Sequence, residues 1–150
     1  MFKIRLLVLV ALCSLSINPS FSQDGVVGYV KTVQGNATVV LSGQVMKAQP
    51  GTPIQIGSVL RTDKQGSMGV IFKDNTIMSL GSDTEISVDE YLFAPDKGDL
   101  KLGASMSRGS LNYVSGLIAK LRPEAVSLKT PTGIIGVRGT HFLAKVEADE

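Results

Sequence analysis

The sequence contains one cysteine and one histidine, and neither sign of charge is in marked excess. The cysteine, Cys13, lies in a segment that we expect to be removed, so no disulfide can hold the exported chain together. With a single histidine, a zinc centre would have to rely on carboxylates. The formal net charge is +2, and nucleic-acid-binding proteins usually carry a basic stripe. We therefore expect no nucleic-acid partner.

The first 22 residues have the anatomy of a secretory signal peptide. Its parts are a basic start with Lys3 and Arg5, an apolar run over residues 6–17, and Ser20 and Ser22 ahead of a cleavage point before Gln23. The run is shorter than the roughly 20 residues of a membrane-spanning helix. We expect residues 1–22 to be removed on export. Residues 23–150 then form a single periplasmic or secreted domain that does not span a membrane.

From residue 26 onward, apolar and polar residues alternate, and turn residues interrupt the alternation at short intervals. Alternation places apolar side chains on one face of a strand. Clear cases are Ala37, Val39 and Leu41, then Met68, Val70 and Phe72, then Leu100, Leu102, Ala104 and Met106, and finally Val126 and Leu128. The pattern predicts an all-β fold of many short antiparallel strands, sandwich or jelly-roll-like, with a short β-solenoid as the alternative.

Two local irregularities interrupt this pattern. Ile86 and Val88 are out of phase with Tyr91 and Phe93, and one extra residue at Asp89 or Glu90, a β-bulge, would restore the register. The apolar residues of segment 116–122 could share a helical face, and the proline that follows would end the helix. We expect at most this one short helix.

The segment Thr130–Phe142 carries three glycines spaced three apart, Gly133, Gly136 and Gly139. A P-loop needs a lysine after its last glycine, and a dinucleotide-binding loop needs glycines at a different spacing between a strand and a helix. Neither requirement is met. Glycines within strands mark bends or close approaches of the backbone. We therefore interpret the segment, including Thr140, as scaffold in which a strand bends to cross the domain.

Arg138 lies among these glycines with apolar residues on both sides. This position predicts a partly buried guanidinium group. A buried charge needs a partner, because an unpaired one costs several kcal/mol. The candidate partners are Asp74, Asp83 and Glu85.

The sequence gives little support for a metal site, a catalytic nucleophile or a pair of catalytic carboxylates. His141 has no neighbouring ligands at metal-binding spacing, and no serine sits in a nucleophile-elbow motif. The carboxylate pairs at 83/85 and 89/90 are better explained as solvated strand ends than as the facing acids of a glycosidase. The loop over residues 74–84 lacks the dense ligand spacing of a calcium loop. We expect no catalytic residue, cofactor or metal.

Two blocks, at residues 57–76 and 130–142, read with the segment at residues 28–40, resemble the FecR domain family of exported bacterial proteins. They are "GSVLRTDKQGSMGVIFKDNT" and "TPTGIIGVRGTHF", and the segment reads "GYVKTVQGNATVV". The resemblance extends over about residues 26–146. It implies an exported all-β domain with a binding role and no catalytic residues. The regulator that names the family also has a cytoplasmic anti-sigma segment, which we do not expect ahead of a signal peptide.

We therefore expect a non-enzymatic exported module, a sensory or signalling partner of an envelope protein. The alternative is a structural or polysaccharide-binding component of the envelope or extracellular matrix. Strand addition at an exposed sheet edge is a recurrent mode of recognition. The candidate edge is Tyr29, Val30 and Lys31, where the lysine would discourage uncontrolled pairing.

The signal peptide generates the first testable prediction. Protein recovered from the periplasm or medium of a bacterial host should have lost residues 1–22 and should begin at Gln23, because a signal peptidase removes such segments. Intact-mass measurement checks this. An exported protein that still begins at Met1 would contradict it.

Overall fold

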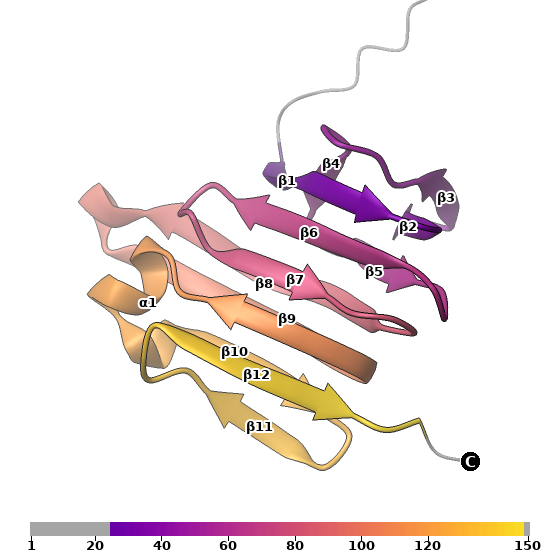
Figure 1. Ribbon diagram of the computed structural model, residues 1–150. Coiled ribbons are helices and arrows are strands. Elements are labelled where there is room, and N and C mark those ends of the chain that lie inside the picture. Colours follow the sequence, from indigo (N-terminus) through magenta and orange to yellow (C-terminus); the bar gives the residue numbers. More distant parts are fainter. Residues whose placement is uncertain (1–24, 149–150) are drawn as a thin grey trace, which may run out of the picture.

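The computed structural model describes residues 25–148 (Figure 1). The expected signal peptide lies outside this range. Within it, no helix has both the length and the apolar character needed to cross a bilayer. The described residues form 12 strands, one short α-helix and two 3₁₀ turns, at Pro95–Lys97 and Pro123–Ala125.

The elements follow one another in short succession. They are β1 (Val26–Gln34), β2 (Ala37–Leu41), β3 (Gln44–Lys47), β4 (Pro53–Gln55), β5 (Val59–Thr62), β6 (Ser67–Phe72), β7 (Ile77–Leu80), β8 (Glu85–Ala94), β9 (Asp99–Val114), α1 (Leu117–Leu121), β10 (Val126–Thr130), β11 (Gly133–Gly136) and β12 (His141–Val146). The predicted all-β class with at most one short helix is confirmed.

The strands form one continuous sheet that folds over into two layers, and β9 belongs to both (Figure 1). The first part of β9 pairs with β8 and, in parallel, with β10. Its last part pairs with β7 and β12. We call β1, β4, β6, β7, the end of β9 and β12 the front layer. The back layer comprises β2, β3, β5, β8, the start of β9, β10 and β11.

The change of layer occurs at Gly109, whose φ of +99° is unfavourable for a residue with a side chain. A Cβ at this position would also overlap Thr84. The bend therefore requires glycine for two independent reasons. Because β9 turns here, the two layers face each other and enclose the core.

The core lies between the layers and follows the predicted alternation. Met68, Val70 and Phe72 point inward from β6 in the front layer, and Leu102 and Met106 point inward from β9 in the back layer. All five belong to one cluster of buried apolar residues. The predicted bulge is confirmed as well: Val88 pairs with Ala104 and Glu90 with Gly103, which leaves the intervening residue of β8 without a partner.

Tyr113 belongs to this core. Its ring stacks on Phe142 at a centroid distance of 4.8 Å, and its side chain is 1% exposed. Its hydroxyl group has no hydrogen-bond partner within residues 25–148. Burial raises the pKa of Tyr113 from 10.0 to about 12, because desolvation disfavours the tyrosinate anion. Burial also raises the pKa of Tyr91.

Replacing Tyr113 by phenylalanine should leave stability at pH 7 unchanged or raise it by up to about 1–3 kcal/mol, since an unsatisfied buried hydroxyl is removed. The wild-type tyrosine ionises more readily in the unfolded chain. Its contribution to stability is therefore complete below pH 10 and is lost as the pH rises from 10 to about 12. Urea unfolding at pH 7 and pH 11 should show a smaller alkaline loss for the variant. Marked destabilisation at pH 7 would contradict this.

Candidate functional site

The glycine-rich segment carries the chain from the back layer to the front layer. β10 and β11 form a hairpin in the back layer, and β12 pairs with the end of β9 in the front layer. The crossing is tied to Ser115 at the end of β9: its hydroxyl donates to the carbonyl of Gly139 at 2.6 Å, and its N–H donates to the carbonyl of Thr140 at 2.9 Å. Gly139 has a φ of +142°. At Gly133 and Gly136 a Cβ would meet open space.

Arg138 lies on the surface of this crossing, and the prediction that it is partly buried is wrong. Its neighbour Val137 is 4% exposed and fills the core, so Arg138 points outward. Within residues 25–148 it takes part in no ion pair. The three carboxylates proposed as its partners have other partners.

Asp74 is fully buried and is held by hydroxyl and backbone donors. Its carboxylate accepts hydrogen bonds from the hydroxyls of Thr76 at 2.7 Å and Tyr91 at 3.0 Å, and from the N–H groups of Thr76 at 3.3 Å and Ile118 at 3.2 Å. Its own carbonyl accepts from Leu117 N–H at 2.7 Å. Such donors compensate for the desolvation of a carboxylate. Asp74 thereby joins the β6–β7 turn to β8 and to the start of α1.

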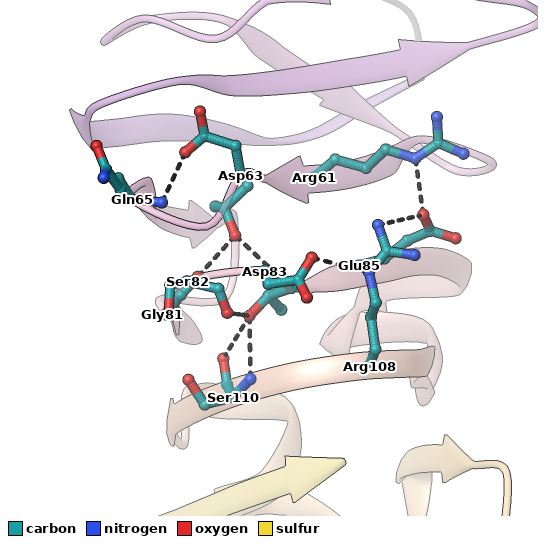
Figure 2. A network of polar contacts seen from close by, with 11 residues as sticks. Arg61, Asp63, Gln65, Gly81, Ser82, Asp83, Glu85, Arg108 and Ser110 are labelled. Atoms are coloured by element: carbon teal, nitrogen blue, oxygen red, sulfur yellow. Dashed lines mark hydrogen bonds and ion pairs between the residues drawn. The ribbon is translucent and has the colours of Figure 1, made fainter. Parts of the chain in front are cut away.

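Asp83 and Glu85 form ion pairs with two arginines near the bend of β9 (Figure 2). Arg61 Nε lies 2.8 Å from Glu85 Oε2, and Arg108 Nε lies 3.2 Å from Asp83 Oδ1. Arg108 also reaches Glu85 Oε2 at 3.7 Å. All four side chains are partly exposed to solvent. Exposed ion pairs contribute about 0–1 kcal/mol to stability. We therefore interpret these pairs as surface features of the fold.

Two threonines and a serine hold the bend itself. Thr84 is fully buried, and its hydroxyl oxygen accepts from Ser110 N–H at 3.0 Å. Thr62 donates from its hydroxyl to the carbonyl of Gly81 at 2.6 Å and accepts from Thr84 N–H at 3.0 Å. These contacts connect β5, the β7–β8 turn and β9.

The remaining candidate, His141, is exposed on β12, and its Nε2 contacts Asn112 Oδ1. Within the part of the chain that the structure describes, no three residues among His, Cys, Asp and Glu gather closely enough to hold a metal ion. The Asp83 and Glu85 carboxylates contact arginines instead.

The prediction that Tyr29, Val30 and Lys31 form an exposed edge is wrong, because β1 lies between two neighbouring strands. β6 pairs with one side of β1, and β4 pairs with its other side. Val30 N–H donates to the carbonyl of Thr52 at 2.9 Å, and the Val30 carbonyl accepts from Gly51 N–H at 2.8 Å. The chain after β3 thus returns to cover the predicted edge.

Two edge strands, β11 and β12, instead lie at the C-terminal end of the two layers (Figure 1). Within residues 25–148, β11 pairs with β10 alone and β12 with β9 alone. A groove of about 610 Å³ runs between them, lined chiefly by residues 130–135 and 143–147. Ile134 and Leu143 line it with side chains that are 69% and 76% exposed. We call this feature the open-end groove.

Within residues 25–148, the backbone of β12 presents groups beside this groove that pair with no other strand. Ser115 N–H bonds to the carbonyl of Thr140, and bonded pairs alternate along an antiparallel ladder. The register then directs the N–H and C=O groups of His141, Leu143 and Lys145 away from β9. Sequence reasoning missed this edge, although one signal was present. Leu143 is apolar but alternates in the sequence with the same spacing as the polar residues His141 and Lys145.

Comparison with known families gives one match. The family model described as FecR protein matches residues 58–150, which is more than half of the chain. Comparisons with curated proteins and with solved structures gave no match. The matched region includes β9, the Asp74 contacts and both strands of the open-end groove.

The reassignment of Asp74 and Arg138 can be tested with two variants. Asp74→Asn should lower the free energy of unfolding by about 2–3 kcal/mol, because it removes charged hydrogen bonds and turns an amide donor toward other donors. Arg138→Ala should change it by no more than about 0.5 kcal/mol, as expected of a surface position. Urea unfolding measures both. A large loss for Arg138→Ala would restore the buried-arginine hypothesis.

Proposed function

The chain belongs to the FecR family of periplasmic sensing and signalling domains, and from this premise we propose that it is an exported signalling module. We propose further that it binds an envelope protein and catalyses no reaction. The observation that carries the proposal is the unpaired edge of β12 beside the open-end groove.

An unpaired edge can accept an extended segment of another protein as an additional strand. Backbone hydrogen bonds to His141, Leu143 and Lys145 would supply much of the affinity. The groove would supply specificity, because alternate side chains of the added strand would reach Ile134 and Leu143. Lys145, paired with Glu147 at 3.4 Å, places charge at this edge and limits uncontrolled pairing.

A second edge of the sheet, at β3, is less suitable. β3 also lies at the end of the strand order and exposes Val45, at 66%. However, β3 has four residues and follows directly after the turn at Ser42 and Gly43. β12 has six residues and adjoins the open-end groove. An added strand therefore gains more backbone bonds and more side-chain contacts at β12.

A proline scan at the edges tests this function. Leu143→Pro removes a backbone donor that points away from β9, so the fold should tolerate it. Val45→Pro is the matched control, because the β3 register directs the N–H of Val45 away from β2. Tagged wild-type and variant proteins would be used to capture envelope proteins, and hydrogen exchange would be measured on the complex.

The expected result is that Leu143→Pro weakens capture at least tenfold, a loss of about 1.4 kcal/mol, while Val45→Pro does not. Amides at 141, 143 and 145 should become protected in the complex. Capture that survives Leu143→Pro in a folded variant would contradict the edge assignment. Specific retention by envelope polysaccharide instead of protein would favour the structural, polymer-binding alternative.

A further inference from the structure

The outer face of the front layer carries an apolar row that crosses its strands. The register places Tyr29 beside Ile71, Ile71 beside Ile77, and Ile77 beside Val114. Three of these side chains are 37–40% exposed. His141 continues the row on β12. With strands about 4.8 Å apart, the row is roughly 19 Å long.

The two rows beside it consist mostly of small residues. The nearer contains Gly69, Ser79 and Asn112, and ends at Leu143. The farther contains Ser67, Gly81 and Ser110, and ends at Lys145. Space for a side chain is absent at Gly81, because a Cβ there would overlap the Ser110 hydroxyl. A groove of about 400 Å³ lies over Ser79, Gly81 and Ser110.

The outer face of the back layer provides an internal comparison. Its corresponding row across β5, β8, β9 and β10 reads Val59, Ser87, Ser105 and Lys129. The hydroxyls of Ser87 and Ser105 both donate to the Asp89 carboxylate. This row is polar at its centre, on β8, β9 and β10, as expected of a solvent-exposed sheet, and it becomes apolar only toward its margins, at Val40 and Val45 on one side and Ile134 on the other. The front-face row, in contrast, is apolar across its central strands β6, β7 and β9 and calls for a separate explanation.

We propose that the front face binds the front face of a second copy of this chain. The two-fold axis runs parallel to the rows and passes along the middle row, which contains Ser79. It places the apolar row of each copy over the row of Ser67, Gly81 and Ser110 in the other copy. Large side chains then face small ones at every central strand. A two-fold interface needs this kind of self-complementarity, and sheets packed face to face interdigitate in the same way.

The charges on this face agree with the arrangement. The three rows on β6, β7 and β9 contain no charged side chain. Lys31 lies at one margin on β1, and His141 and Lys145 lie at the other on β12. The axis would thus bury a neutral centre and leave the charged groups at the rim, where water screens them.

The size of the patch sets the expected affinity. Five strands by three rows give an area at the lower end of specific interfaces, so we expect a dissociation constant in the micromolar range. This inference goes beyond the proposed function, because the second copy covers the face of β12 and leaves its edge accessible. A dimer would present two edges and would bind a clustered partner bivalently.

Analytical ultracentrifugation over a concentration series tests the dimer. Ile77→Glu and Val114→Lys should each weaken it at least tenfold, because each places a charge in the neutral centre. Leu92→Glu is the control, since Leu92 is 52% exposed on the back layer. A wild-type chain that remains monomeric up to about 1 mM would overturn the proposal, as would a dimer that neither folded front-face variant weakens.

Cross-linking locates the axis independently. The described residues contain no cysteine, so in a Cys13→Ser background a single Ser79→Cys reports on one position. A short bis-maleimide should join two copies through Ser79→Cys and not through Ser87→Cys on the back face. Equal linking of both, or linking of Ser87→Cys alone, would overturn the arrangement. Neither result depends on partner capture at β12, so failure of this proposal is distinguishable from failure of the proposed function.

Discussion

The hydroxyl of Thr84 accepts a hydrogen bond from the N–H of Ser110 and holds β9 where it leaves the back layer and enters the front layer. Gly109 supplies the positive φ, and its missing side chain leaves the space that Thr84 occupies. Without this turn the end of β9 would not enter the front layer. Both its partners there, β7 and β12, depend on that placement, and so do the edge and the face to which we assign binding.

Local pattern was sufficient for some elements and insufficient for others. The alternation in β6 and β9, the bulge in β8 and the short helix α1 follow from neighbouring residues, so the sequence predicts them. The edge could not be found in this way. Whether β1 is covered depends on β4, which returns to it from 24 or more residues later in the chain. The exposure of Arg138 likewise depends on the crossing to β12, which is a tertiary feature.

Asp74 illustrates how a buried carboxylate is compensated without an ion pair among the described residues. The sequence suggests an arginine as its partner, since opposite charges are the obvious solution. The structure provides hydroxyl and N–H donors from Thr76, Tyr91 and Ile118. Thr76 is local and could have been anticipated from the turn. Tyr91 and Ile118 come from β8 and α1, so only the folded chain brings them together.

β12 contributes to both proposed surfaces without conflict because a strand directs its groups along perpendicular axes. Its unpaired N–H and C=O groups lie in the plane of the sheet, whereas the side chains of His141, Leu143 and Lys145 stand out from that plane. An added strand would use the first set and a second copy the second. Leu143 and Lys145 are shared, since both border the open-end groove and the groove on the front face. A substitution of either side chain would therefore alter both surfaces, whereas the backbone groups in the plane of the sheet serve only the added strand.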